Sequence, residues 1–185
     1  PPGAIQGQTV VEFSPDGRWL AVGYQNGVVV VWNRATWRRT VLRRGGNAHR
    51  NFMRQLSFDA NSTWLLTASA DGLVRLWSLR SGAFVREFEQ GGNARGAAFS
   101  PSGRRIVTVG DNGVARVWDV YTGALQFEYA GHAGPIWMAR YAPDGGTFVT
   151  ASGDGQARIW NADLRQDALV RTLSDRERSM GPLRT

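Results

Sequence analysis

A unit of about forty residues occurs four times in this chain of 185 residues. The copies read FSPDGRWLAVGYQNGVVVVW from Phe13, FDANSTWLLTASADGLVRLW from Phe58, FSPSGRRIVTVGDNGVARVW from Phe99 and YAPDGGTFVTASGDGQARIW from Tyr141. Each copy starts with an aromatic residue and ends with a tryptophan nineteen residues later. The four tryptophans, separated by 45, 41 and 42 residues, are Trp32, Trp77, Trp118 and Trp160. A period of this length predicts a repeat architecture in which each unit packs against its neighbours.

Short strands and tight turns make up each unit. Apolar and polar residues alternate up to a turn such as Pro-Asp-Gly, and a second strand such as RWLAVG runs back. The later ADG, DNG and GDG sequences tolerate the positive φ that a tight hairpin turn requires. A third strand ends at the tryptophan, and a fourth apolar segment such as AFVREFE follows another turn. Each unit is therefore predicted to be a four-stranded antiparallel meander, and no helical periodicity is seen in any long window.

The sheets are expected to pack on one another. Strands such as VVVVW and FVTAS are apolar on both faces, so both faces need to be covered. We expect the four meanders to form one structural unit over residues 1–185, with a flexible tail or linker stub at 175–185. The four meanders are expected at about residues 9–43, 53–89, 94–130 and 136–174.

The pattern resembles the WD40-repeat β-propeller family over roughly residues 9–174. The resemblance implies an all-β fold of four four-stranded antiparallel blades. These blades would be part of a larger propeller or half of a dimeric eight-bladed ring, in which a homodimer completes the circle. A closed ring of four blades is a third alternative. The residues that carry the resemblance are Gly131-His132, Pro143-Asp144-Gly145, Asp154-Gly155, Trp160-Asn161 and the literal pair Trp118-Asp119.

The resemblance also implies hydrogen-bonded structural tetrads. One tetrad is His132, Thr150, Asp154 and Trp160, and the other is His49, Thr67, Asp71 and Trp77. Both have offsets of eighteen, four and six residues, and together they use the only two histidines of the chain. In the third unit the corresponding residues are Gln90, Thr108, Asn112 and Trp118, and in the first they are Ala4, Val22, Asn26 and Trp32. We expect the third and first units to depend on packing rather than on a polar network.

Several classes of function are disfavoured by the residues present. The duplicated His, Asp and Thr set has no nucleophile-elbow sequence beside it, so we expect no catalytic residues and no enzyme. The chain has no cysteine and its two histidines lie in different units, so no metal site is expected. GGNARG lacks the Lys-Ser/Thr of a P-loop, and no cofactor is expected. No apolar run approaches the roughly 20 residues that cross a bilayer, so we expect a cytoplasmic protein without membrane contact.

Partner binding is the function that the resemblance implies. In this family, partner-binding positions lie near the start of the innermost strand and just before the tetrad Asp. By alignment these positions are Thr9, Arg54, Arg95 and Trp137, and then Gln25, Ala70, Asp111 and Gly153. We expect the channel-mouth site to consist of Arg54, Arg95, Trp137, Gln25 and Asp111. The predicted function is a noncatalytic scaffold or sensor module of a larger regulatory protein, with another protein or peptide as partner.

Basic residues support an alternative function. All 22 basic residues are arginine, and the formal net charge is +7. An Arg-rich surface could contact phosphates, so the alternative is anion or nucleic-acid binding. The cluster that favours it is Arg34, Arg38, Arg39, Arg43, Arg44, Arg50 and Arg54. Three other arginines, two residues before a tryptophan, are expected to be solvated surface residues: Arg75, Arg116 and Arg158.

Overall fold

The computed structural model describes residues 10–163 and 168–174, and its strands form four antiparallel sheets of four consecutive strands each. Blade one contains β1 (Val10–Phe13), β2 (Trp19–Gly23), β3 (Val29–Asn33) and β4 (Arg39–Leu42). Blade two contains β5 (Met53–Phe58), β6 (Trp64–Ser69), β7 (Leu73–Ser78) and β8 (Phe84–Glu89). Blade three contains β9 (Ala94–Phe99), β10 (Arg105–Gly110), β11 (Ala115–Asp119) and β12 (Leu125–Tyr129). Blade four contains β13 (Ile136–Tyr141), β14 (Thr147–Ser152), β15 (Gln156–Asn161) and β16 (Leu169–Ser174).

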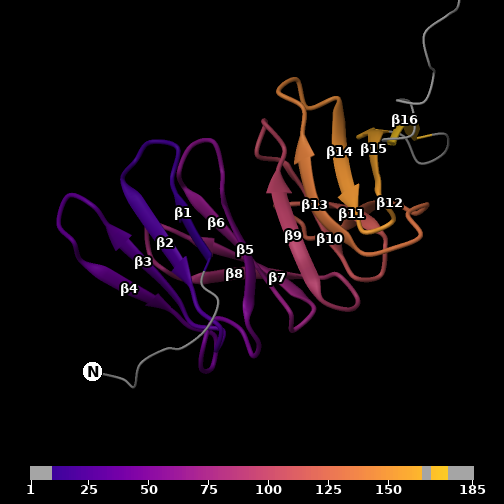
Figure 1. Cartoon of the computed structure of the whole chain (residues 1–185). Helices are drawn as coiled ribbons and strands as arrows, with labels where there is room; N and C mark the ends of the chain where they lie inside the picture. The colour runs from indigo at the N-terminus through magenta and orange to yellow at the C-terminus, as the bar shows by residue number, and fades with distance from the viewer. Residues whose placement is uncertain (1–9, 164–167, 175–185) are drawn as a thin grey trace, which may run out of the picture.

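The prediction of four all-β meanders is confirmed, and the described residues contain no helix. Figure 1 shows the blades following one another in chain order, from β1–β4 on the left to β13–β16 on the right. The first strand of each blade is its inner strand: β1 lies beside β5, β5 beside β9, and β9 beside β13. The last strand of each blade, at the opposite edge, pairs with one neighbour only. Residues near the start of neighbouring inner strands therefore lie close together.

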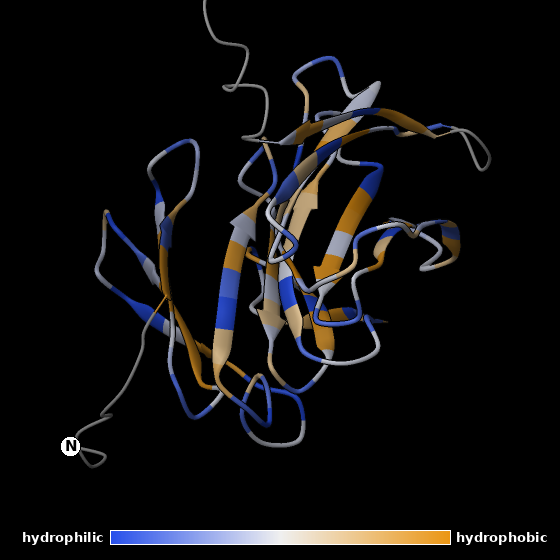
Figure 2. Cartoon of the chain, turned by 45° about the vertical axis from the view of Figure 1, so that its right-hand side comes forward, coloured by the Kyte–Doolittle hydropathy of each residue, from blue (hydrophilic) through white to orange (hydrophobic). Residues whose placement is uncertain are grey.

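Three apolar clusters hold consecutive blades together. Figure 2 shows apolar residues along the strands and hydrophilic residues in many of the connecting turns. Blades one and two bury a cluster that includes Val31, Leu42, Leu65 and Trp77. Blades two and three bury Leu66, Leu76, Phe88 and Ile106, and blades three and four bury Val107, Val117, Phe148 and Trp160. Sheets that are apolar on both faces are thus covered by their neighbours.

The first and last blades do not cover each other. On blade four, Val149 is 38% exposed, whereas the residues at the same position of blades three and two, Val107 and Leu66, are 0% and 1% exposed. On blade one, Val11 is 63% exposed, whereas its blade-two equivalent Leu56 is 4% exposed. Of the three arrangements considered from the sequence, the closed ring of four blades is therefore not the one adopted. The chain forms an open row with an apolar face at each end.

Candidate functional site

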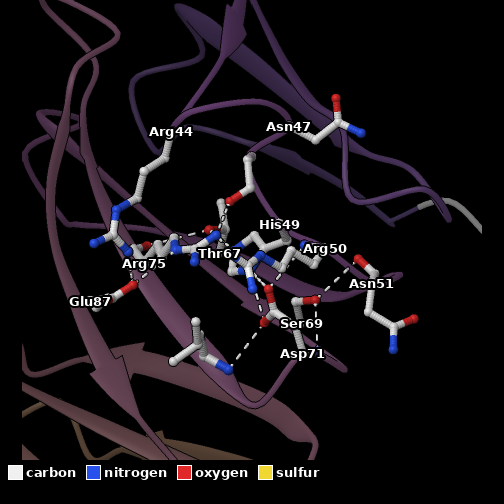
Figure 3. Close-up of polar contacts among 12 residues, drawn as sticks. Arg44, Asn47, His49, Arg50, Asn51, Thr67, Ser69, Asp71, Arg75 and Glu87 are labelled. Carbon is white, nitrogen blue, oxygen red and sulfur yellow. Dashed lines mark hydrogen bonds and ion pairs between the residues drawn. The ribbon is translucent and has the colours of Figure 1, made fainter.

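A chain of hydrogen bonds runs through the interior of blade two (Figure 3). The indole Nε1–H of Trp77 donates to Thr67 Oγ1 at 2.9 Å, and Thr67 Oγ1 lies 2.7 Å from His49 Nε2. His49 Nδ1 lies 3.0 Å from Asp71 Oδ2. Burial lowers the pKa of His49 and outweighs the attraction of Asp71, so the imidazole is neutral. A neutral ring that donates its Nδ1–H to the carboxylate accepts a hydrogen bond from the Thr67 hydroxyl at Nε2. Each polar side chain of this network therefore has a partner.

Asp71 connects two separate segments of blade two. Burial opposes its ionisation, but the hydrogen bond from His49 and two backbone N–H donors outweigh it and lower the pKa of Asp71 to about 2. Those donors are the N–H groups of Arg50 and Leu73, each 3.1 Å from a carboxylate oxygen. Arg50 belongs to the connection 43–52 and Leu73 begins β7. The Asp71 carboxylate therefore fixes the inter-blade connection to the turn between β6 and β7.

Blade four repeats this arrangement. Trp160 Nε1–H donates to Thr150 Oγ1 at 2.9 Å, and Thr150 Oγ1 lies 2.7 Å from His132 Nε2. His132 Nδ1 lies 2.8 Å from Asp154 Oδ2. Burial again opposes ionisation of Asp154, but the His132 hydrogen bond and the N–H groups of Ala133 and Gln156 lower its pKa to about 2. The structure thus brings together all four residues of each sequence-predicted tetrad.

Blade three keeps a polar network, which corrects the expectation that packing alone would replace it. Trp118 Nε1–H donates to Thr108 Oγ1 at 2.9 Å, and Thr108 donates in turn to Gln90 Oε1. Gln90 Nε2–H donates to Asn112 Oδ1 at 3.1 Å. The Gln amide offers an acceptor and a donor in the same order as neutral imidazole, so it takes the place of histidine without a titratable group. In blade one, Val22 occupies the Thr position and offers no hydroxyl.

The tetrads do not have the access that catalysis requires. Their residue types match a Ser/Thr-His-Asp triad, but the Thr67 and Thr150 side chains belong to residues that are 0% exposed. A hydroxyl that no substrate can reach cannot act as a nucleophile. The described residues also contain no group of three or more His, Cys, Asp or Glu side chains suited to hold a metal ion. The arrangement is suited to fixing strands and connections within a blade.

Arg75 is buried, which corrects its prediction as a solvated surface residue. It is 6% exposed and donates to the carbonyl oxygen of Ala48 and, through Nε, to Glu87 Oε2 at 3.3 Å. Its guanidinium therefore bridges the connection 43–52 and the outer strand β8 (Figure 3). The two other arginines at this position are half-buried: Arg116 donates to Glu128 Oε1 at 2.6 Å, and Arg158 donates to Gln156 Oε1 at 2.8 Å.

The candidate partner-binding residues sit on three equivalent β-bulges. The register of β5 against β6 shifts between Met53 and Gln55, which leaves Arg54 without a partner residue. The pairing of β9 with β10 skips Arg95, and that of β13 with β14 skips Trp137. A bulge redirects the side chain of its extra residue and is common beside functional sites. The same irregularity therefore places one side chain from each of three blades in a common groove, which we call the channel-mouth groove.

Arg95 connects these side chains. Its guanidinium carbon lies 4.0 Å from the ring centroid of Trp137, and its Nε forms an ion pair with Asp111. Asn93 Nδ2 also donates to Asp111 at 2.6 Å. Burial opposes ionisation of Asp111, but these hydrogen bonds outweigh it and lower the pKa of the carboxyl. The charge of Arg95 is thus held in a fixed place beside an exposed indole, because Trp137 is 47% exposed.

Arg54 differs from Arg95 because its guanidinium Nε–H has no hydrogen-bond acceptor. Its guanidinium carbon lies 4.3 Å from the ring centroid of Phe52, and its Nε is buried with no hydrogen-bond partner. Burial and the nearby charge of Arg95 lower the pKa of Arg54, while Asp111 raises it. A buried donor without an acceptor costs stability.

A groove of about 270 Å³ holds the three bulge residues together. Asp111 is joined to this groove through Arg95, whereas Gln25 lies on the exposed turn between β2 and β3 and does not line it. Thr9 and Ala4 lie outside the described residues. Sequence reasoning missed two exposed groove residues on β13, Met138 and Arg140, which only the register of that strand could have indicated. The lining comprises Val10, Val11, Glu12, Arg54, Gln55, Leu56, Arg95, Trp137, Met138 and Arg140.

The arginine cluster does not form one continuous free surface. Arg44 forms an ion pair with Glu87, and its guanidinium carbon lies 4.2 Å from the Phe84 ring centroid. It borders a second cavity of about 580 Å³ together with Arg50 and the tetrad residues His49 and Asp71. Arg54 instead belongs to the channel-mouth groove. The exposed cluster members that border neither of these two cavities are Arg34, Arg38, Arg39 and Arg43.

Four-stranded blades with adjacent inner strands and a buried polar network in three of them define a β-propeller repeat protein. The family model described as "WD domain, G-beta repeat" matches residues 5–33, 41–78, 82–119 and 123–161, and the chain belongs to this WD40 family. The last three matched segments each begin near the outer strand of one blade and end at the third strand of the next. The sequence repeat and the sheet are therefore offset by one strand, so each repeat connects two blades.

Relatives match part of this chain. WD repeat-containing protein 1 of Gallus gallus is 30% identical over 83 residues, 45% of this chain and 14% of that protein. Actin-interacting protein 1 of Drosophila melanogaster is 36% identical over 81 residues, 44% of this chain and 13% of that protein. Set1 complex component swd1 of Schizosaccharomyces pombe is 35% identical over 77 residues, 42% of this chain and 19% of that protein. The matched region thus spans less than a fifth of each of these relatives.

Proposed function

We propose that this chain is a noncatalytic protein-protein interaction module whose channel-mouth groove binds a peptide segment of a partner. The observation that carries the proposal is the set of three equivalent bulges, which present Arg54, Arg95 and Trp137 to one groove. Arg and Trp contribute much of the binding energy at many interfaces. The WD40 family is generally noncatalytic, and the tetrad hydroxyls of this chain are buried.

The groove favours a peptide that combines an acceptor oxygen with an apolar side chain. Arg54 and Arg140 line the groove and form no ion pair in the described part of the chain, so a carboxylate or carbonyl oxygen is suited to this end. Trp137 is 47% exposed and would cover an aromatic or aliphatic side chain. The position of Arg95 is set by Asp111, so part of the binding surface is already ordered before a partner arrives.

The cellular setting of this module is proposed from its relatives and its exposed faces. Two relatives are named as an actin-interacting protein and as a component of the Set1 complex, which supports a role in a larger regulatory assembly. No helix among the described residues is long and apolar enough to span a membrane. We place the module in the cytoplasm. We propose that its principal ligand is a peptide bound in the channel-mouth groove rather than a nucleic acid.

Another sheet is proposed to cover the apolar faces of blades one and four. Val11 and Phe13 on blade one are 63% and 57% exposed, and Met138 and Val149 on blade four are 49% and 38% exposed. Further blades of a longer chain or a second copy completing an eight-bladed ring would bury them. Light scattering of the chain at several concentrations distinguishes these arrangements: a stable mass of twice 20.3 kDa supports the second copy, and a stable monomer contradicts it.

Selection from a displayed random-peptide library tests the channel-mouth proposal without a known partner. The wild-type protein is expected to enrich related peptides that the double variant Arg54→Ala, Trp137→Ala no longer retains. The matched control replaces two exposed arginines elsewhere, Arg80→Ala and Arg104→Ala, and should retain the same peptides. Equal retention by the groove variant would place the binding surface elsewhere on the module.

A further inference from the structure

A tryptophan occupies a backbone position that glycine holds in two other blades. The turns after β3, β7 and β11 close with the same hydrogen bond, for example Ser78 N–H to Ala83 O at 3.0 Å in blade two. The residue before the acceptor is Gly82 in blade two and Gly123 in blade three, with φ of +69° and +77°. In blade one it is Trp37, with φ of +51°. A bulky residue in this left-handed region is strained, because its Cβ crowds the backbone.

The strain at Trp37 is not compensated by packing of its side chain. Trp37 is 64% exposed, so the indole contributes little to the core. Ser62, the other non-glycine residue with positive φ in the described ranges, differs because its hydroxyl accepts a hydrogen bond from the Asp16 N–H at 3.2 Å. A strained and exposed tryptophan costs stability in two ways. Such an outlier points to a function on the surface that carries it.

The sequence segment around Trp37 carries positive charge only. The sequence contains no Asp or Glu between Asp16 and Asp59, whereas it contains eight arginines there. Arg38, Arg39 and Arg43 are exposed, and none of them takes part in a salt bridge within the described part of the chain. We call Trp37, Arg38, Arg39 and Arg43 the β4-edge surface. Its charge complements an acidic partner.

The backbone of β4 adds a second feature that suits a partner. β4 is the outer strand of blade one and pairs only with β3, so its far edge is available (Figure 1). Two of the other outer strands contain acidic residues, Glu87 and Glu89 in β8 and Glu128 in β12, whereas β16 contains Arg171 and no acidic residue. A free strand edge can accept an extended segment through main-chain hydrogen bonds. Arginines alone could serve to keep such an edge unpaired, because their charges repel one another across two paired edges. An exposed tryptophan beside the edge instead offers an apolar surface to a partner.

We propose that an extended acidic segment of a partner protein pairs along the free edge of β4. Its carboxylates would lie at Arg38, Arg39 and Arg43, and one of its apolar side chains would rest on Trp37. Single-stranded nucleic acid fits this surface less well, because it uses several aromatic platforms and has no use for a free strand edge. The β4-edge surface and the channel-mouth groove share no residue, so this inference does not depend on the proposed function.

Fluorescence anisotropy with labelled peptides tests the proposal. The probe is a short peptide that alternates Glu and Val, and its controls are the same peptide with Lys for Glu and one with N-methylated backbone amides. Only the unmodified acidic peptide is expected to bind, because N-methylation blocks strand pairing. Equal binding of the N-methylated peptide would overturn the pairing on β4. Binding of a single-stranded oligothymidylate in preference to the acidic peptide would overturn the choice of partner.

Two variants assign the binding to this surface. Trp37→Gly keeps the turn, since glycine holds the same position in blades two and three, and is expected to weaken binding about tenfold. Arg39→Ala is expected to weaken it about fivefold and to reduce its salt dependence. Arg80→Ala, an exposed arginine on the equivalent turn of blade two, is the control and should bind like the wild type. Unchanged affinity of both Trp37→Gly and Arg39→Ala would contradict the proposal.

Discussion

Blades one and two differ in the residues at equivalent positions of their two sheets. Where blade two has Thr67 and Arg75, blade one has Val22 and Val30, and both keep a tryptophan at the end of the third strand. In blade two this face packs against blade one and holds the polar network. In blade one the face is apolar and exposed at Val11, which is 63% exposed.

This difference shows what the polar network contributes to a blade. In blade two it joins the tryptophan of the third strand to the turn between β6 and β7, and Asp71 extends it to the connection 43–52. In blade one Val22 takes the place of the threonine, so no side-chain hydroxyl joins Trp32 to the turn between β2 and β3. A purely apolar face is suited to be covered by another sheet. Substitutions at equivalent positions of the two blades distinguish the contribution of the hydrogen bonds from that of apolar packing.

The largest difference is expected when the tryptophan is removed from each blade. Trp77 is 0% exposed and hydrogen-bonded, so Trp77→Ala should lower the free energy of unfolding by about 3–5 kcal/mol. Trp32 is half-buried, so Trp32→Ala should cost about 1–2 kcal/mol. Urea unfolding followed by circular dichroism measures both values. Equal losses for the two variants would show that the blades do not differ in this way.

Exchanging threonine and valine, which have nearly the same shape, tests the contribution of the hydrogen bonds separately from that of packing. Thr67→Val leaves the Trp77 N–H and the His49 ring without their common partner, so a loss of about 2–3 kcal/mol is expected. The reverse change in blade one, Val22→Thr, adds a hydroxyl to a half-buried apolar face and should cost no more than about 1 kcal/mol. The same unfolding assay applies. A Thr67→Val protein as stable as the wild type would exclude a structural role for the network.

Acid should weaken blade two through Asp71. The pKa of its carboxyl is about 2 in the folded chain against an ordinary 3.8, so its contribution of about 2 kcal/mol is present above pH 4 and lost as the pH falls toward 2. Burial also lowers the pKa of His49 below 6.5, so protonation of the unfolded chain reduces stability as the pH falls below that value. When the free energy of unfolding is measured against pH, Asp71→Asn should reduce the loss of stability below pH 4. Asn26→Ala, at the equivalent site of blade one, should leave that loss unchanged.

The smallest expected effect concerns the strained turn of blade one. Trp37→Gly relieves the left-handed strain but makes the unfolded chain more flexible, so the net change should be a gain of about 0.5 kcal/mol. Gly82→Ala at the same turn of blade two should instead be destabilising, because a Cβ there would lie 2.7 Å from Thr40 Cγ2. Differential scanning calorimetry resolves the two directions. A large loss in Trp37→Gly would mean that the indole has a packing role.

Much of the fold followed from repetition in the sequence. The spacing of Trp32, Trp77, Trp118 and Trp160, with turn residues at fixed offsets, predicts four meanders because each turn type allows few connections. The network of Gln90 and Asn112 was missed because an amide can replace imidazole only when its oxygen and nitrogen face the right partners. The burial of Arg75 was missed because its partner Ala48 lies on a connection whose path the repeat does not specify.

The candidate site was only partly predictable for a similar reason. Alignment with the family placed Arg54, Arg95 and Trp137 near the start of inner strands, but the bulges that redirect them depend on strand register. Gln25 was included by alignment, yet it does not line the groove. The contact between Arg95 and Trp137 joins two blades, so no pattern within one repeat could indicate it. That the groove binds a partner stays a prediction.

The central claim is that buried tetrads maintain the blades while the bulge residues bind a partner. The most direct test is the affinity of a library-selected peptide for Trp137→Ala, measured by calorimetry together with the unfolding midpoint of the same protein. Trp137 is 47% exposed, so the variant should melt close to the wild type and bind at least about tenfold more weakly. Wild-type affinity in this folded variant would contradict the assignment of the channel mouth as the binding site.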